Sequence, residues 1–122
     1  MFALRAYLVV EPTRARRPEE LRADGTIVNE GDTPVEIDPA PLSSPSLAIE
    51  ITDRSGQPVP LPPPPVPRAP EPPVRLAPEQ QYGFSFPGFV PGWIEPGVYR
   101  ARVRYIANGE TVVSDWREFA LA

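Results

Sequence analysis

Residues 96–105 read Pro96-Gly97-Val98-Tyr99-Arg100-Ala101-Arg102-Val103-Arg104-Tyr105, the most regular stretch of the chain. After the Pro-Gly turn, one parity carries a valine and three arginines, and the other carries two tyrosines, an alanine and a valine. Because successive side chains of a β-strand point to opposite faces, this alternation predicts a long, half-buried strand. We expect the tyrosine face to enter the core and the arginine face to meet solvent.

The composition favours an all-β fold. The chain has 122 residues, enough to bury one core, so we expect a single domain covering 1–122. It contains 20 prolines, against a usual share of roughly 5% of residues. Proline breaks helix interiors, and few windows long enough for a helix lack one. We therefore expect strands connected by long loops.

The residue types that are missing exclude whole classes of site. Without cysteine or histidine, the chain has no disulfide, no thiolate nucleophile, no Cys/His zinc site and no triad based on imidazole. The carboxylates form neither a calcium loop nor an acid–base pattern, and no glycine-rich phosphate loop joins a strand to a helix. We therefore expect no enzyme, no metal and no cofactor.

Net charge and hydropathy limit the classes of partner that we expect for this protein. A net charge of −4 argues against binding nucleic acid, which usually requires a basic face. The apolar start, 1–10, is short and interrupted by Arg5 and Tyr7, unlike a signal peptide. No window approaches the ~20 apolar residues that a membrane span needs. We expect no membrane partner and a cytoplasmic protein, or an extracytoplasmic one if Met1 does not belong to the natural chain.

Short apolar runs separated by turn signals extend the strand pattern along the whole chain. The expected strands are 2–10, 21–28, 35–37, 47–52, 74–76, 82–86, 97–105 and 111–121. Gly25 weakens the middle of the second one, and 11–20 reads as a charged loop. Seven to eight such strands predict an immunoglobulin-like (Ig-like) antiparallel β-sandwich, with the proline-rich stretch 58–73 as a long connection inside it.

The last strand contains a conflict of parity. Asn-Gly at 108–109 predicts a two-residue hairpin turn. On that register Trp116 joins the tyrosine face, whereas Phe119 and Leu121 fall on the arginine face. Strict alternation cannot bury all three, so we predict a β-bulge between Ser114 and Arg117 that resets the parity.

Tyr99 opens its strand directly after a crossover between the sheets. A tyrosine corner occupies this position in Ig-like sandwiches, with the hydroxyl bonded back to the backbone a few residues upstream. We predict such a corner, and the alternative is an ordinary core tyrosine.

Five pieces of sequence resemble bacterial Ig-like domains and, more narrowly, the bacterial intracellular proteinase inhibitor family. They are the Asn turn followed by Pro-Val (29–35), a strand closing on Asp-x-x-Gly (47–56), Leu-x-Pro-Glu before an aromatic strand (76–86), Gly-x-Tyr (97–99) and Phe-x-Leu (119–121). The resemblance covers most of 20–121. It implies a small, cytoplasmic, cysteine-free Ig-like protein that binds a protease, and it carries over no residue of an inhibitory loop.

Three stretches are candidates for partner contact. Ten of the sixteen residues in 58–73 are proline, and Leu61, Pro62, Pro63, Pro64 and Pro65 resemble the core of EVH1 ligands. The loop 87–97 carries Phe89, Trp93 and Ile94, which either cap the core or form a binding hot spot. Arg100, Arg102 and Arg104 form a row that an acidic partner could use. The alternative readings are a stiff connection for the prolines and ordinary cross-strand charge, such as Arg102 facing Asp115, for the row.

We therefore predict a non-catalytic Ig-like protein-binding or assembly module. Its partner would be another protein, or a second copy of the chain meeting an exposed sheet edge. One alternative is a protease inhibitor that acts through an exposed loop. Another is an accessory domain of a larger protein.

Overall fold

The computed structural model describes residues 3–37, 47–60, 73–86, 89–107 and 109–122. The protein is an all-β antiparallel sandwich, with ten strands in these ranges in place of the expected seven to eight. The two additional strands are a short pairing within 11–20 and the division of the last strand in two. The strands are β1 Leu4–Glu11, β2 Arg14–Ala15, β3 Arg22–Asn29, β4 Val35–Ile37, β5 Leu47–Asp53, β6 Val74–Leu76, β7 Gln81–Phe86, β8 Gly97–Ala107, β9 Glu110–Val113 and β10 Arg117–Leu121.

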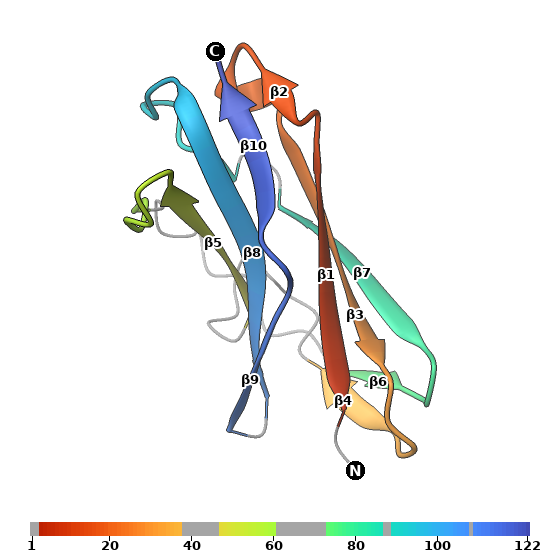
Figure 1. Ribbon diagram of the computed structural model, residues 1–122. Helices are drawn as coiled ribbons and strands as arrows, with labels where there is room; N and C mark the ends of the chain where they lie inside the picture. Colours follow the sequence, from red (N-terminus) through yellow and green to blue (C-terminus); the bar gives the residue numbers. More distant parts are fainter. Residues whose placement is uncertain (1–2, 38–46, 61–72, 87–88, 108) are drawn as a thin grey trace.

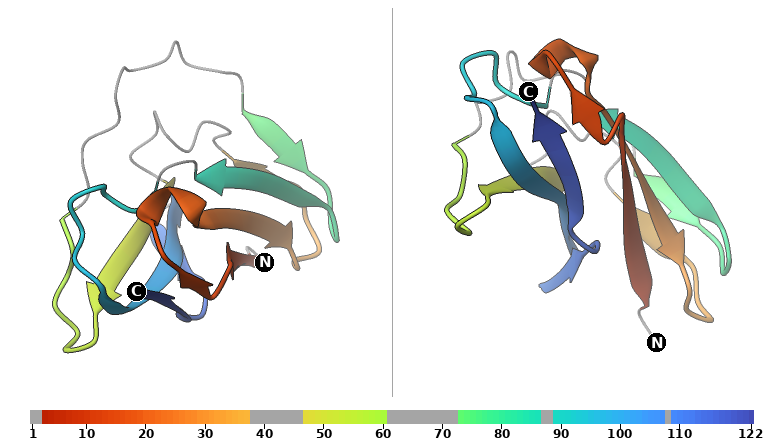
Figure 2. Two further views of the ribbon diagram at one scale, coloured as in Figure 1. Left: turned by 90° about the horizontal axis from the view of Figure 1, so that it is seen from above. Right: turned by 45° about the horizontal axis from the view of Figure 1, so that its top comes forward.

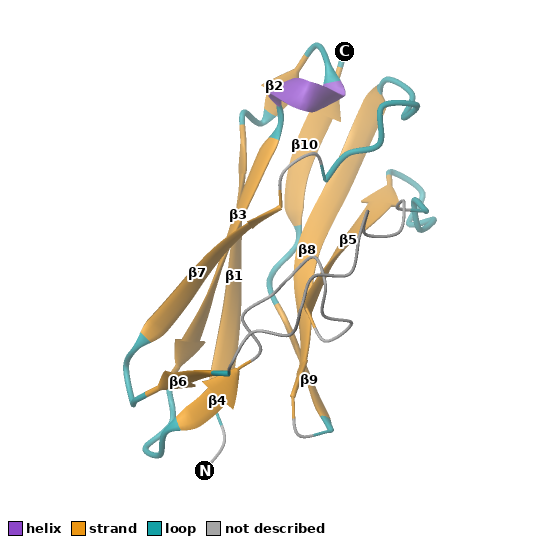
Figure 3. Cartoon of the chain, turned by 180° about the vertical axis from the view of Figure 1, so that it is seen from behind, coloured by secondary structure: helices purple, strands orange, loops and turns teal. Residues whose placement is uncertain are grey.

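Two sheets face each other across the core (Figures 1 and 2). One has the order β1-β3-β7, and the other has the order β2-β10-β8-β5 with β9 paired to β8. Strands β4 and β6 form a separate pair near one end, which is seen from behind in Figure 3.

Strand β8 confirms the alternation read from the sequence. Tyr99, Ala101, Val103 and Tyr105 are buried. Beside them, Phe119 of β10 is only 1% exposed and lies 5.8 Å from the Tyr99 ring, centroid to centroid, in a stacked arrangement. Burial of apolar side chains such as these is the main favourable contribution to the stability of a fold.

The β-bulge also forms where the sequence predicts it. Tyr105 pairs with Val112 in the hairpin, as the Asn-Gly turn requires, but Ala101 pairs with Arg117, one residue later than an unbroken ladder would give. Ser114 lies at the break, where its backbone N–H donates to the Val103 carbonyl over 2.9 Å. Its hydroxyl oxygen accepts the Val103 N–H, also at 2.9 Å. The extra residue buries Phe119 and Leu121.

Trp116 contradicts the simple register. It does not join the tyrosine face but lies half-buried on the arginine face, against the guanidinium groups of Arg100 and Arg102. The bulge explains this position, because the extra residue gives Trp116 the parity of Glu118 and Ala120, which pair with Arg100 and Val98 on the arginine face.

Gly25 lies in the middle of β3, and its lack of a side chain makes room for a neighbouring aromatic ring. The glycine is paired with Phe84 of β7. A Cβ atom added at this position would lie 2.2 Å from Cε2 of the Phe84 ring. The glycine that seemed to weaken the strand therefore provides the space that the ring fills.

The charged loop predicted for 11–20 is partly ordered into secondary structure. Residues Arg14–Ala15 pair in parallel with β10, and Pro18–Glu20 form one 3₁₀ turn. This pairing covers the outer edge of β10 at Ala120 and Leu121, so that part of the edge is not free for another strand. Among the described residues the 3₁₀ turn is the only helix, and it is far too short to cross a membrane.

Candidate functional site

The crossover loop 89–96 between β7 and β8 divides its apolar residues between the core and the surface. Phe89, Val90 and Ile94 are buried, and the Phe89 ring packs edge-on against Phe119 at 5.8 Å. Trp93 is 63% exposed. Of the three predicted contact residues in this loop, Phe89 and Ile94 therefore cap the core, and Trp93 is the one that a partner can reach.

The end of this loop is held by a tyrosine corner, as predicted. The Tyr99 hydroxyl donates a hydrogen bond of 2.6 Å to the backbone carbonyl of Glu95. Burial of the ring, together with the nearby carboxylates of Glu95 and Asp53, raises the pKa of the Tyr99 phenol. The hydroxyl therefore stays protonated and can serve as a donor at ordinary pH.

The arginine row on the outer face of β8 is held by Glu50 of β5 and by Trp116 at the bulge between β9 and β10. Arg102 Nε donates to Glu50 Oε1 of β5 at 2.9 Å, and Arg104 lies 3.8 Å from the other oxygen of the same carboxylate. Arg102 is therefore paired with Glu50 and not with Asp115, because β5 supplies the residue directly opposite it. The Trp116 ring lies beneath Arg102, 4.4 Å from the guanidinium carbon, in a cation–π contact.

Arg100 lies at the other end of the row and has a different environment. It is exposed and contributes to a shallow pocket of about 410 Å³ together with Arg54, Val98 and Glu118. Arg54 projects from the turn after β5. That turn is fixed by Asp53, whose carboxylate accepts hydrogen bonds from the hydroxyl and amide of Ser55. These bonds, the Ser55 hydroxyl first, lower the pKa of the Asp53 carboxyl.

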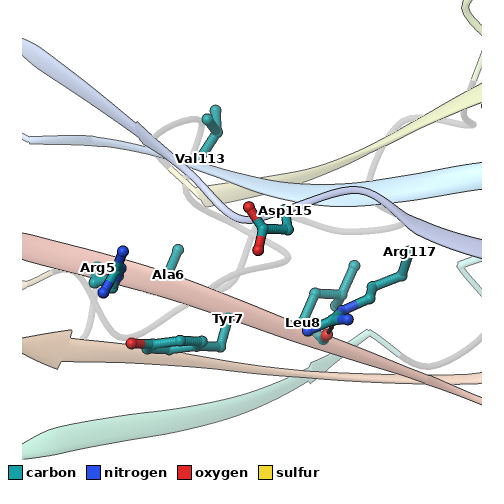
Figure 4. Close-up of a pocket in the computed structure, with 7 residues that line it drawn as sticks. All are labelled: Arg5, Ala6, Tyr7, Leu8, Val113, Asp115 and Arg117. Atoms are coloured by element: carbon teal, nitrogen blue, oxygen red, sulfur yellow. Dashed lines mark hydrogen bonds between the residues drawn. The ribbon is translucent and has the colours of Figure 1, made fainter.

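A second pocket, of about 340 Å³, lies at the seam where β1 approaches the bulge (Figure 4). Its lining includes Arg5 to Leu8 on one side and Val113, Asp115 and Arg117 on the other. Arg117 Nε donates to the Leu8 carbonyl at 2.9 Å and so joins β10 to β1, one strand from each sheet. This contact gives Arg117 a structural role. The other charged groups of the pocket are Arg5 and Asp115, and the three together suggest no reaction.

The opposite end of the sandwich depends on Asn29, a buried polar residue whose role the sequence did not reveal. Its amide nitrogen donates to the carbonyls of Thr33, at 2.9 Å, and Leu76, at 3.0 Å. Its side-chain oxygen accepts the Gly31 N–H at 3.0 Å. The Asn-Glu-Gly turn indicated a local role for the asparagine. Its bond to Leu76 could not be predicted in the same way, because it joins residues 47 positions apart.

The described residues contain no metal-binding cluster, and the shifted pKa values of Tyr99 and Asp53 have a structural explanation. In the ranges that the structure covers, no three His, Cys, Asp or Glu side chains gather where a metal could be held. The raised pKa of Tyr99 and the lowered pKa of Asp53 belong to groups whose hydrogen bonds fix a loop and a turn. The predicted EVH1-like stretch, Leu61 to Pro65, lies outside the described residues and stays a prediction.

No family model and no curated protein matches the chain. Among solved structures, it is similar to a β-glucosidase, EmGH1, from Erythrobacter marinus, with a TM-score of 0.55 and 14% identity over 99% of this chain and 16% of that one. It is also similar to a β-glucosidase from Listeria innocua, with a TM-score of 0.52 and 18% identity over 98% of this chain and 16% of that one. The chain therefore spans about a sixth of the length of these enzymes, and the likeness shows a shared fold.

Proposed function

We propose that the protein is a non-catalytic protein-binding module that presents Trp93 to its partner. The observation that supports this proposal is the exposure of Trp93, at 63%, on a loop whose other large apolar side chains are buried. Tryptophan is enriched among the residues that contribute most to protein–protein binding, because it removes a large rigid surface from water. A tryptophan that only stabilised the fold would be buried beside Phe89 and Ile94.

The loop is also ordered before any partner arrives. Phe89 and Ile94 anchor it in the core, and the Tyr99 hydroxyl holds the Glu95 carbonyl two residues after the tryptophan. Ordering a loop on binding costs free energy, and a loop that is already fixed avoids much of that cost. The loop therefore resembles a prepared contact surface.

Site-specific photo-cross-linking tests the proposal. A photoreactive phenylalanine analogue replaces Glu95 in one version of the protein and Glu110 in a second, so that Trp93 itself is kept in both. Glu95 is exposed two residues after Trp93, and Glu110 is exposed in the hairpin at the far end of β8, so Glu110 provides a matched control. We expect a defined partner to be captured from position 95 of the protein in its native lysate and not from position 110. Equal capture from both positions, or none from position 95, would contradict the proposal.

A second candidate function is that of an accessory domain within a larger protein. It is supported by the solved structures of similar fold, in which this chain matches only 16% of each enzyme. An antibody against the domain, used on a denaturing gel of the native lysate, tests this candidate directly. A band well above 13.4 kDa is expected for an accessory domain, and a band at that mass contradicts it.

The protease-inhibitor alternative stays a prediction, because no contact in the described residues favours it. Serine proteases assayed with micromolar protein would retain full activity and digest the domain if this alternative is wrong.

A further inference from the structure

Among the described residues, two neighbouring arginines lack an ion-paired carboxylate: Arg100 on the outer face of β8 and Arg54 in the turn after β5. Within the described residues, Arg54 and Arg100 form no ion pair, whereas Arg102 and Arg104 share the carboxylate of Glu50. Glu118 lies directly across the ladder from Arg100 but makes no ion pair with it. Both unpaired arginines line the pocket of about 410 Å³.

The Trp116 ring restricts Arg100 in advance of any ligand. Its guanidinium carbon lies 5.6 Å from the centre of the ring, on which Arg102 also stacks. Arg102 is fixed in turn by its 2.9 Å bond to Glu50. An arginine that is already held loses less side-chain entropy when it binds a ligand.

Arg54 approaches the pocket from a turn with little freedom. The Asp53 carboxylate accepts bonds from the amides of Ser55 and Gln57, at 2.9 and 3.0 Å. The backbone of the turn is thereby fixed next to Arg54, and Arg54 lines the same pocket as Arg100.

We propose that this pocket binds the carboxylate side chains of an acidic protein segment. Guanidinium groups bind carboxylates through two parallel hydrogen bonds, and two of them without partners in one pocket complement such a ligand in charge. Val98, which also lines the pocket, offers apolar contact to the methylene groups of an aspartate or glutamate.

The negative charge of Glu118 makes the pocket prefer a carboxylate ligand to a phosphate ligand. Its negative charge lies in the same pocket and repels any anion that enters. A phosphoryl group carries about −1.5 to −2 charges near neutral pH, so it suffers this repulsion more than a singly charged carboxylate does. The pocket therefore favours an acidic segment over a phosphorylated one.

The pocket is formed by β8, β10 and the turn after β5, and the Trp93 side chain takes no part in it. The proposal does not depend on the tryptophan surface, and either site can fail alone. The experiment uses the protein with the substitution Trp93→Phe, which removes the tryptophan surface of the proposed function. The same substitution leaves Trp116 as the one tryptophan.

The probe is a capped six-residue peptide of alternating aspartate and valine, labelled with a fluorophore. Anisotropy of the label reports binding, and emission of Trp116 reports whether the peptide reaches the ring on which Arg100 stacks. We expect saturable binding that weakens as salt is added. An asparagine–valine peptide is expected not to bind.

Three matched variants locate the site. Arg100→Gln and Arg54→Gln are each expected to weaken binding by roughly three- to tenfold, and Glu118→Gln to strengthen it by roughly threefold. Arg22→Gln makes the same change of charge at an exposed site on β3 in the other sheet, and is expected to leave binding unchanged. Circular dichroism confirms that each variant is folded, and Arg54→Gln keeps the test decisive if Arg100→Gln perturbs the sheet.

Three outcomes overturn the proposal. The first is an absence of binding at up to about millimolar peptide. The second is an equal loss with Arg22→Gln, which would show attraction to overall charge and no site. The third is tighter binding of a phosphoserine–valine peptide than of the aspartate peptide, which would show that the ligand class is wrong.

Discussion

The two ends of the sandwich are closed in different ways. At one end, the turn after β3 is held by the buried amide of Asn29, which is 0% exposed and bonds to Thr33, Leu76 and Gly31. At the other end, the crossover loop 89–96 is held by buried apolar side chains and by the hydroxyl of Tyr99. We call the end at Asn29 the polar end, because hydrogen bonds dominate there. We call the end at the loop 89–96 the packed end, because apolar packing dominates there.

The difference shows which end is available for function. The turn at Asn29, residues 29–33, contains no apolar side chain. We therefore assign its hydrogen bonds to the stability of the fold. The loop 89–96 has more apolar surface than the core accepts and leaves Trp93 outside. A surface that stability does not require is where we place the contact with a partner.

The largest effect is expected at the polar end. Asn29→Ala would remove the partners of the Leu76 carbonyl and the Gly31 N–H, and unpaired buried polar groups are costly. We expect the free energy of unfolding, measured with urea, to fall by about 3 kcal/mol. As a control, Asn29→Asp keeps an oxygen for Gly31 but loses both donated bonds, so it should not restore stability. A loss below about 1 kcal/mol for Asn29→Ala would mean that the turn is held by other contacts.

The packed end is expected to respond next most strongly at Ile94. This side chain is buried, and Ile94→Ala would leave a cavity beneath the loop. We expect a loss of about 2 kcal/mol in the same urea titration, at the low end of the range for such truncations because the loop can partly collapse. Faster proteolysis within the loop 89–96 should accompany this loss, and an unchanged cleavage rate would show that Ile94 does not anchor it.

Tyr99→Phe tests the side-chain hydrogen bond that holds the packed end. The ring keeps its stacked contact with Phe119, and only the 2.6 Å bond to the Glu95 carbonyl disappears. We expect a loss of about 1 kcal/mol. Tyr7→Phe is a matched control, because Tyr7 is exposed in β1. If the two substitutions cost the same, the corner contributes nothing that an exposed tyrosine does not.

The corner also predicts a dependence on alkaline pH. The pKa of Tyr99 is raised in the folded protein, chiefly by burial. Below the ordinary value of about 10 both states are protonated, and the contribution of the corner is complete. As the pH rises further, the unfolded chain loses its proton first, so stability falls. Urea titrations between pH 9 and about 11 should show a smaller decline for Tyr99→Phe than for the parent protein. Parallel declines would contradict a raised pKa.

Much of the packed end could be predicted from the sequence because its signals are local. The alternation of 97–105 fixed the faces of β8, and the position of Tyr99 after a crossover indicated the corner. The bulge followed from a conflict between the Asn-Gly turn and the two apolar residues near the C-terminus. Each of these inferences needs only strand periodicity and the geometry of one turn.

The remaining features depend on which distant strands become neighbours. Arg102 binds Glu50 because β5 lies beside β8, and the spacing within a hairpin cannot reveal that neighbour. The bond from Asn29 to Leu76 and the fit of Phe84 over Gly25 also join separate parts of the chain. Sequence reasoning placed Phe89, Trp93 and Ile94 in one loop, but only the packing separates the two anchors from the exposed tryptophan.

Trp93→Ala is expected to have the smallest effect on stability and so separates function from fold most cleanly. Because the side chain is 63% exposed, its removal should change the free energy of unfolding by no more than about 0.5 kcal/mol. A hot-spot tryptophan, in contrast, contributes roughly 2 kcal/mol or more to binding, so binding of the cross-linked partner should weaken by about thirtyfold. Urea titration and a binding titration on one preparation measure both quantities. A stability loss as large as that of Ile94→Ala would mean that Trp93 belongs to the core, and the packed end would then present nothing to a partner.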